Sequence, residues 1–496
     1  MKELVYRISL LFLFVAPLTT YAQQVNTLYF LENAPMRHLF NPAFQPISQG
    51  YANISPLGYS NFTIGNNSLT VSDLIYKDET TGNTITALHP NGDKTALLSR
   101  LQSSLFMNTD AALNILGFGF RIKDNGYFHF NLLERVESGA STPKELYSIL
   151  LGGELDVSGQ NSINLSQLAL NASLYTEASF GYSHVINESW TVGGKLKMLF
   201  GTAYAGIDNS SFSIDASVEE WRIKGNSNLY VSGPIQWANI PNEINKDTLS
   251  KIGSDVVNTD DIAYLLKPSG YGVAVDIGFT YRPIDQLQIS ASLNDLGFIY
   301  WNNSRVYNCT IDTTFTGVGD FSYSDYVVDG SFESDSLLSD AQENLQMLLS
   351  GVQASRTGGA GFARALSAKL NLGVDLNFWD NRIGVGLAAS TRLYNRRLYG
   401  EVTLGAALRP CNWFNIALSY SLVNNGKYSN IGAGLSFMPY DGINLTLAMD
   451  YIPTTYAYYS YDDDNPQKLA PIPYKAKGIN VALGFSIVWG TNKARQ

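Results

Sequence analysis

The sequence predicts an all-β fold: a transmembrane outer-membrane β-barrel of about 14–16 antiparallel strands, a usual size for this class. Three observations lead to this prediction. Apolar residues alternate with small or polar ones, the composition is low in charge and rich in aromatic residues, and the connections sort by length. We expect short periplasmic turns and long extracellular loops that carry short helices.

The alternation is clearest toward the C-terminus. Large apolar side chains occupy every second position from Phe414 to Leu422, with small or polar residues such as Ser419 between them. The pattern returns at 431–437, 443–451 and 479–489. Successive side chains of a strand point to opposite faces, so each strand has one apolar face. A soluble sandwich shows the same alternation with its apolar face inward, and the other features decide the direction.

The composition favours the membrane alternative. Charged residues make up 15% of the chain, compared with roughly 25% in soluble domains. Aromatic residues reach 12%, and 30 of them are Tyr. Beyond the N-terminus no apolar run approaches the roughly 18 residues that a membrane helix needs. The net charge of −10 argues against nucleic acid as a partner, because binding it requires a basic surface.

The N-terminus has the features of a secretory signal peptide. A basic start and a short apolar core end in small residues at Ala22, and we expect cleavage before Gln23. The core is too short for a membrane anchor. The expected domains are a signal peptide at 1–22, a periplasmic arm or plug at 23–50, and the transmembrane barrel at 51–496.

The arm is rich in proline and in large apolar residues. Proline cannot donate to a strand ladder, which excludes a central strand here. Two alternatives remain: an ordered periplasmic arm, or a plug inside the barrel. Apolar residues from Leu28 to Phe44 must be buried somewhere, and the mouth of the barrel is the nearest cover. We therefore expect the plug or gate residues Asn41, Pro42, Ala43 and Phe44 at or inside that mouth, with the Asn41 side chain bonded to backbone.

The N-terminal half is expected to begin with a strand at 51–65 and an amphipathic helix at 91–106. Asp124-Asn125-Gly126 is a strong hairpin signal between strands at 111–122 and 127–136. Thr142-Pro143-Lys144-Glu145 is a capping box that opens a short helix through Leu150. Further strands are expected at 173–186, 190–200, 204–218 and 221–232.

The C-terminal half continues the pattern between two long connections, 233–269 and 302–361. A helix near 337–353 is expected inside the second connection, from its helical apolar spacing. Strands are expected at 272–281, 287–296, 370–378, 383–393 and 398–408, before the C-terminal ladder. All tight turns fall at one end of the strands and all long connections at the other, as in outer-membrane barrels.

Polar residues on the small faces of the strands are expected to line the lumen. Lys195 and Lys197 lie two apart, hence on one face, and on the lipid side each would cost about 2–4 kcal/mol. They would pair with lumen carboxylates or with an acidic head group of a ligand. The lumen candidates are Lys195, Lys197, Asp276, Asn294, Asp375, Arg392, Glu401 and Asp450.

The sequence gives no reason to expect an enzyme, a metal site or a cofactor. Ser183 and His184 are adjacent and would point to opposite faces of a strand, so they cannot form a nucleophile–base pair. The acidic run 462–465 lacks the spacing and central glycine of a calcium loop. The two cysteines, Cys309 and Cys411, lack metal-ligand spacing.

Three stretches carry a resemblance to known barrels. Residues 194–201, 275–281 and 292–301 are similar to a Bacteroidota outer-membrane family of unknown function. Asn41-Pro42-Ala43 before a C-terminal barrel also resembles FadL-like barrels, which pass hydrophobic compounds, and PorV-type barrels of a secretion system. The resemblance implies an outer-membrane location and carries over no ligand residue.

Two functions of different classes follow. The first is a barrel that passes or binds a hydrophobic or amphipathic solute and uses the N-terminal segment as its gate. The second is a non-transporting interaction barrel that binds a secretion or envelope protein through its loops. An apolar lumen favours the first, whereas a plugged, ion-paired lumen favours the second. Outer-membrane lipid is the expected surrounding in both.

Overall fold

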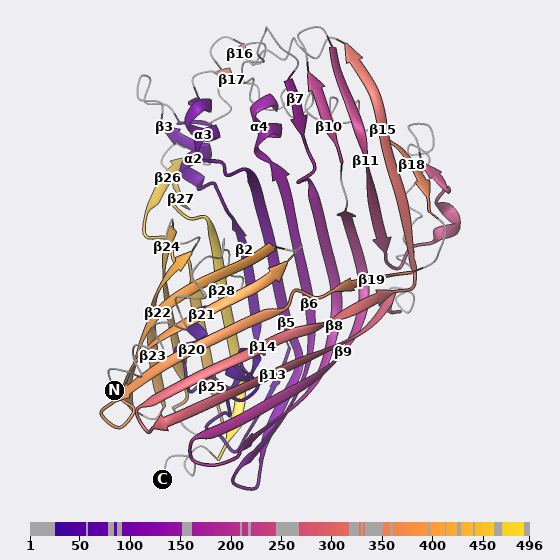
Figure 1. Cartoon of the computed structure of the whole chain (residues 1–496). Coiled ribbons are helices and arrows are strands. Elements are labelled where there is room, and N and C mark those ends of the chain that lie inside the picture. The colour runs from indigo at the N-terminus through magenta and orange to yellow at the C-terminus, as the bar shows by residue number, and fades with distance from the viewer. Residues whose placement is uncertain are drawn as a thin grey trace.

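The chain folds into one closed barrel with a sheet that projects from one end (Figure 1). The computed structural model describes residues 25–55, 58–77, 84–86, 92–150, 161–208, 211–216, 220–244, 267–316, 327–328, 331–332, 351–357, 361–394, 397–411, 413–423, 428–439, 442–460 and 469–490. None of the helices in these ranges is long and apolar enough to cross a membrane.

The barrel wall has 14 strand positions, all antiparallel to their neighbours. β1 and β2 share one position, β19 and β20 share another, and β28 closes the wall against β1 and β2. In order around the barrel the wall strands are β1 (Gly50–Ile54) with β2 (Ser60–Asn66), β5 (Ser104–Ile122), β6 (Gly126–Pro143), β8 (Ala169–Val185), β9 (Trp190–Asp208), β13 (Gly270–Ile284), β14 (Leu287–Trp301), β19 (Phe362–Ala365) with β20 (Lys369–Phe378), β21 (Ile383–Tyr394), β22 (Arg397–Cys411), β23 (Phe414–Val423), β24 (Tyr428–Phe437), β25 (Asn444–Asp450) and β28 (Gly478–Trp489).

Large apolar side chains face outward from this wall and small or polar ones face the lumen. On β23 the alternation is complete: Leu418 is 59% exposed and Ser419 is 5% exposed. The outward direction of the apolar face is therefore confirmed. In a bilayer such a wall satisfies every backbone group through its ladders and offers lipid an apolar surface.

The connections segregate as the sequence predicts. Tight turns join β5 to β6, β8 to β9, β13 to β14 and β20 to β21 at one end, here called the short-turn end (Figure 1). The opposite, long-loop end carries the small elements, which are α2 (Val71–Leu74), α3 (Lys94–Arg100), α4 (Lys144–Leu150), η3 (Trp237–Asn239), β3 (Ile75–Lys77), β4 (Thr84–Thr86), β16 (Val327–Val328), β17 (Ser331–Phe332), β26 (Tyr456–Ser460) and β27 (Leu469–Pro473).

The sheet of the wall continues from β9 beyond the long-loop end, and we call this extension the wing (Figure 1). Its strands are β7 (Asn161–Asn164), β10 (Ser213–Ala216), β11 (Glu220–Ser232), β12 (Glu243–Ile244), β15 (Ser304–Thr316) and β18 (Gln353–Arg356). The long connection expected at 302–361 contains a strand that was not predicted, because β15 pairs along the full length of β11. Buried Tyr307, Cys309 and Ile311 alternate with polar residues in β15, which is the pattern of a strand.

Several predicted boundaries also move. The helix expected at 91–106 is confined to α3, because Phe106 already belongs to β5 and pairs with β6. β5 starts earlier than the expected strand at 111–122, β6 ends later than the one at 127–136, and α4 follows β6 directly. The helix near 337–353 falls almost wholly outside the described residues, and Gln353 itself begins β18.

The first strand is interrupted in the middle of the wall, which corrects the single strand expected at 51–65. Residues 55–59 lie between Ile54 and Ser60, whereas their partners on β5, Leu116 and Leu113, are separated by only residues 114 and 115. The extra chain brings the buried side chain of Tyr59 to the lumen. The ladder between the first strand and β28 has the same interruption, since Ala52 pairs with Ile487 and Ser60 with Leu483.

Candidate functional site

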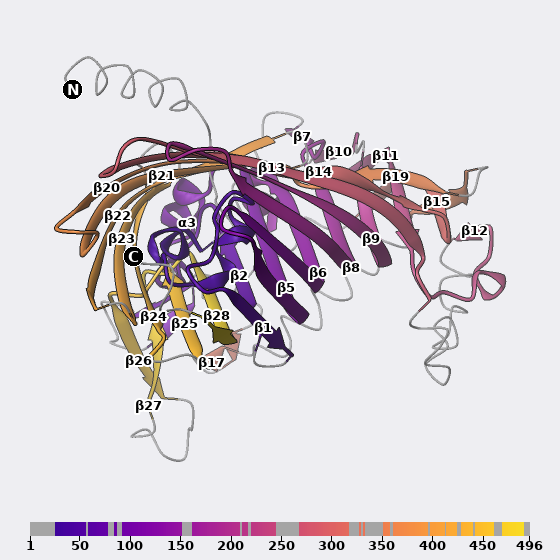
Figure 2. The same cartoon turned by 90° about the horizontal axis from the view of Figure 1, so that it is seen from below.

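Residues 25–49 lie inside the barrel near the short-turn end, and we call them the plug. Seen from that end, the plug is the indigo segment enclosed by the wall (Figure 2). It contains two 3-10 helices, η1 (Asn26–Phe30) and η2 (Pro35–Leu39). Its backbone joins the wall directly at the exit, where the Gln49 N–H donates to the Trp489 carbonyl at 2.9 Å.

The first half of the plug packs against β21 to β25. The Asn26 amide donates to Thr403 Oγ1 at 3.1 Å, and Thr27 Oγ1 lies 2.6 Å from Ser419 Oγ. The Thr27 hydroxyl also donates to the carboxylate of Asp450. These side chains all come from the small or polar faces of the strands, so the lumen lining and the first half of the plug are bonded to each other.

The second half of the plug packs against β1, β6, β13 and β14. His38 lies 3.1 Å from the amide of Asn131, with its ring centroid 4.3 Å from that of His129. The carbonyl of Phe40 accepts hydrogen bonds from three wall side chains, which are Ser292 (2.7 Å), Asn294 (2.7 Å) and Asn371 (3.1 Å).

Asn41 anchors the turn that follows. Its amide nitrogen donates to the carbonyls of Phe279 and Ala291, both at 3.1 Å, and its Oδ1 accepts from the Ala43 N–H at 2.9 Å. Pro42 has no N–H to satisfy, so this turn leaves no buried donor behind. The acceptors are carbonyls of the barrel wall itself.

Two wall glycines make this close approach possible. A Cβ at Gly278 would lie 2.1 Å from Asn41 Oδ1, and a Cβ at Gly193 would lie 2.3 Å from the Pro42 carbonyl carbon. Both contacts are far inside van der Waals distance. The absence of side chains at these positions therefore lets the Asn41–Pro42 segment lie flat on the wall.

The apolar side chains of the plug are buried against small lumen residues. Leu28 and Met36 are 1% exposed and Leu31 is fully buried. They form one cluster with five wall alanines: Ala388, Ala407, Ala417, Ala448 and Ala482. The small faces of the strands thus make room for the bulky residues of the plug.

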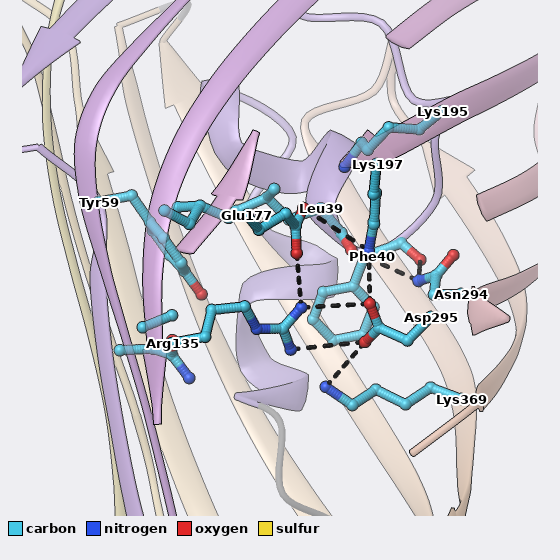
Figure 3. A pocket seen from close by; sticks show the side chains of 13 residues that line it. Leu39, Phe40, Tyr59, Arg135, Glu177, Lys195, Lys197, Asn294, Asp295 and Lys369 are labelled. Atoms are coloured by element: carbon cyan, nitrogen blue, oxygen red, sulfur yellow. Dashed lines mark hydrogen bonds and ion pairs between the residues drawn. The ribbon is translucent and has the colours of Figure 1, made fainter. Parts of the chain in front are cut away.

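A belt of ion pairs crosses the middle of the lumen, and we call it the belt. Asp295 is its centre and bonds to Arg135 (3.1 Å), Lys369 (3.4 Å) and Lys197. Arg135 also bonds to Glu177 at 2.8 Å. The dashed lines of Figure 3 show these contacts converging on Asp295 from different strands.

One arginine reaches across the whole barrel. Arg392 of β21 bonds to Asp110 of β5 at 2.8 Å and to Glu137 of β6 at 2.9 Å. In the order of the wall strands β21 lies opposite β5. All three side chains are nearly buried, with 4%, 10% and 7% exposure.

The belt is neutral in sum. Its cations are Arg135, Lys195, Lys197, Lys369 and Arg392, and its carboxylates are Asp110, Glu137, Glu177, Asp276 and Asp295. Such matching is expected of buried charges, which are rarely left unpaired.

A cavity of about 80 Å³ lies between the plug and the belt. Leu39, Phe40, Tyr59, Ala112 and Leu133 supply apolar lining. The rest of the lining is polar and charged: Asn61, Arg135, Glu177, Lys195, Lys197, Asn294, Asp295 and Lys369 (Figure 3). The cavity therefore has an apolar side next to the interrupted first strand and a charged side with four cations against two carboxylates.

The eight lumen candidates are all buried and face inward, and the structure divides them. Lys195, Lys197, Asp276 and Arg392 belong to the belt, and Asn294 lines the cavity. The remaining three lie on the plug side: Asp375 accepts from the Tyr29 hydroxyl, Asp450 binds Thr27, and Glu401 bonds to Asn430 at 3.3 Å.

Sequence reasoning missed several belt residues, and Asp295 shows why. Strict alternation with the lumen residue Asn294 places Asp295 on the lipid side. The ladder between β13 and β14 is irregular there, and Asp295 has a positive φ of 60°. The adjacent side chains of Asn294 and Asp295 therefore both face the lumen. Arg135 and Glu177 could have been found, because they lie within the expected strands 127–136 and 173–186 and charges are costly on the lipid face. Asp110, Glu137 and Lys369 lie one residue outside the expected strands, whose bounds were drawn too short.

Among the described residues, no group of His, Cys, Asp and Glu is arranged to hold a metal ion. The site therefore consists of a plug, a neutral ion belt and the cavity between them.

One family profile and several solved structures are similar to this chain. The profile of a family described as "Family of unknown function (DUF5723)" matches residues 42–450. No curated protein matches the sequence. Among solved structures, the Ralstonia pickettii toluene transporter TbuX is 9% identical, with 95% of this chain and 96% of that chain covered and a TM-score of 0.40.

Two further solved structures are similar at comparably low sequence identity. A Pseudomonas aeruginosa FadL homologue is 11% identical over 95% of this chain and 99% of that chain, with a TM-score of 0.36. The Pseudomonas putida toluene transporter TodX is 9% identical over 91% and 93%, with a TM-score of 0.39. Likeness this distant carries no argument about what the present chain binds.

Proposed function

The chain belongs to DUF5723, a family of unknown function, and we propose that it is an outer-membrane barrel that binds an amphipathic solute with an acidic head group. The solute would pass the barrel only when the plug moves. The outward apolar face of the closed wall and the signal peptide expected at 1–22 support the location.

The cavity between plug and belt carries this proposal. Its four lining cations exceed its two carboxylates, so an incoming carboxylate would find donors in Arg135 and Lys369. Arginine and lysine form their strongest hydrogen bonds with such anions. The volume of about 80 Å³ suits a head group rather than a whole solute.

The apolar side of the cavity is where the tail of the solute would lie. Tyr59 follows the interruption between β1 and β2, and Leu39 and Phe40 belong to the plug. A tail would leave along the interruption beside Tyr59 or displace Phe40. The second route connects binding to movement of the plug.

Binding of a fluorescent long-chain carboxylate to the purified protein tests the proposal. Lys369→Gln removes one cation but leaves Asp295 bonded to Arg135 and Lys197, and should weaken binding about tenfold. Lys123→Gln, at an exposed turn, is the matched control and should bind like wild type. An alcohol of the same chain length should not distinguish the three proteins. Equal affinity of wild type and Lys369→Gln for the carboxylate would contradict the proposal.

A second candidate, a barrel that binds an envelope or secretion protein and transports nothing, is favoured by the filled lumen. The plug and the belt occupy it, and the wing offers a surface beyond the barrel, where Arg364 of β19 lies 3.9 Å over the ring of Tyr230 of β11. Deleting residues 26–46 separates the two candidates. Increased permeability of liposomes carrying the folded variant supports the transport proposal, and unchanged permeability supports the second candidate.

A further inference from the structure

Two buried histidines meet where the second half of the plug contacts the wall. His38 belongs to η2 and is 0% exposed, and His129 of β6 is 1% exposed. Their ring centroids lie 4.3 Å apart, with 37° between the ring planes. In water an imidazole has an ordinary pKa of about 6.5, so its charge changes near neutral pH. This contact between plug and wall is therefore a place where protons can act.

The hydrogen bonds of His38 suit its neutral form. Its Nδ1 lies 2.8 Å from the carbonyl oxygen of Pro35, which can only accept, so this nitrogen carries the proton. Its Nε2 then accepts from the Asn131 amide at 3.1 Å, with the Tyr51 hydroxyl at 3.4 Å. A second proton on Nε2 would point at the N–H groups of Asn131. Turning the Asn131 amide to accept it would break the bond that its Oδ1 receives from Asn114 at 3.3 Å.

His129 lies in a row of lumen-facing residues that includes a cation. Its partner on β8 is Gly181, and the partner of Gly181 on β9 is Lys195. A Cβ at Gly181 would overlap His129 Nε2, so the ring lies over this glycine, on the side of Lys195. In the part of the chain that the structure describes, His129 Nε2 is buried without a hydrogen-bond partner. An imidazolium here would add a buried positive charge beside that of Lys195, which is costly.

The other titratable groups near the pair do not compensate such a charge. Lys195 acts on both rings and is itself paired with Asp276 at 3.6 Å. Tyr51 and Tyr127 lie on the other side, with ring centroids 6.5 Å apart, and a tyrosine is uncharged near neutral pH. Protons are therefore disfavoured on both imidazoles while the plug is seated. When the second half of the plug moves away, both rings reach water and can bind a proton.

We propose that His38 and His129 form an acid-sensitive latch, which holds the second half of the plug against the wall while both rings are neutral and releases it as the pH falls. The displaced plug binds more protons than the seated one, and a state that binds more protons is favoured by acid. Below about pH 6.5 each imidazole shifts this equilibrium by up to tenfold per pH unit. The latch concerns how the plug is released and is independent of which solute the barrel binds.

Single-channel recording of the purified protein in planar bilayers tests the latch. Between about pH 7.5 and about pH 5.5 the open probability of the wild type should rise by up to about 100-fold, because two imidazoles contribute about tenfold each. His38→Gln and His129→Gln should each reduce this rise to about tenfold. The double variant should lose it, since glutamine forms neutral hydrogen bonds at both pH values. If the double variant folds poorly, the two single variants still carry the test.

His184→Gln is the matched control. His184 also lies in the barrel wall, but its ring packs on that of Tyr182, which is 44% exposed on the outer face. This variant should keep the wild-type response to acid. All other titratable groups are common to these proteins, so the difference in response belongs to His38 and His129. An unchanged open probability of the wild type at the two pH values would overturn the proposal, as would a double variant that responds like the wild type.

Discussion

Arg392 offers the sharpest test of the belt. It joins β21 to β5 and β6 across the lumen through Asp110 at 2.8 Å and Glu137 at 2.9 Å. Arg392→Met keeps most of the aliphatic stem and removes the guanidinium. The variant leaves two carboxylates that face each other without their shared cation, and the belt acquires a net negative charge.

The expected loss follows from burial and bond number. Removing one partner of a buried ion pair costs about 3–5 kcal/mol, because the remaining charge stays buried without compensation. Two hydrogen bonds to charged groups, at about 1.5–3 kcal/mol each, give a similar sum. We therefore expect Arg392→Met to lower the free energy of unfolding by about 3–5 kcal/mol. Adding Asp110→Asn should restore most of this loss, because it leaves four cations and four carboxylates in the belt and Glu137 stays paired with Arg135.

Equilibrium urea unfolding in lipid vesicles, followed by tryptophan fluorescence, measures the effect. Arg222→Met is the control, because Arg222 pairs with Asp312 at 3.0 Å on the wing with both side chains more than half exposed. Its loss should stay below about 1 kcal/mol. If Arg392→Met unfolds within about 1 kcal/mol of wild type, the buried pair contributes nothing and the reasoning fails.

Three other predictions follow from the same geometry. Gly278→Val should dislodge the Asn41 turn and raise the ion conductance of the barrel in planar bilayers. Gly484→Val is the control, because its Cβ would meet only Thr446 at 3.5 Å, and it should conduct like wild type. Equal conductance of the two variants would contradict the close packing at Gly278. Leu418→Arg should lower the free energy of unfolding in bilayers by about 2–4 kcal/mol. Ser419→Arg should lower it by less, although it should displace Thr27. If urea unfolding shows equal losses, the apolar face of the strands would have to point into the barrel. Asp295→Asn should free donors of Arg135, Lys197 and Lys369 and tighten binding of a long-chain carboxylate, and a fluorescence titration showing weaker binding would exclude a head-group site in this cavity.

The wall could be predicted from the sequence because its signal is local. Alternation at Leu418 and Ser419 reports which side of a strand each residue occupies, and this needs no knowledge of the partner strand. β15 was missed because its alternation of apolar and polar residues is short, running only from Tyr307 to Ile311, and its pairing with β11 lies outside the barrel wall. The interruption at residues 55–59 was also missed, because extra residues in a ladder depend on the neighbouring strands.

The lumen was predictable only in part. Lys195 and Lys197 were identified because a charge in mid-strand is costly on the lipid face. Their partners could not be assigned, because pairing across a lumen depends on how the wall closes. Arg392 and Asp110 lie far apart in sequence and meet only because β21 and β5 stand opposite each other. The lumen position of Asp295 could not be predicted from alternation, because it depends on the irregular ladder between β13 and β14.

The plug and the belt close different parts of the lumen. The first half of the plug fills the side lined by β21 to β25, through Thr27 and its neighbours, and no belt residue lies on β22 to β25. The second half lies beneath the belt, where Phe40 is bonded to β14 and β20. Movement of the first half alone would therefore open a path beside an intact belt.

A solute in the cavity touches only the second half, through Leu39 and Phe40. Because both halves belong to one short segment, displacement of Phe40 by a solute would be transmitted through 31–35 to the turn that Thr27 holds at Asp450.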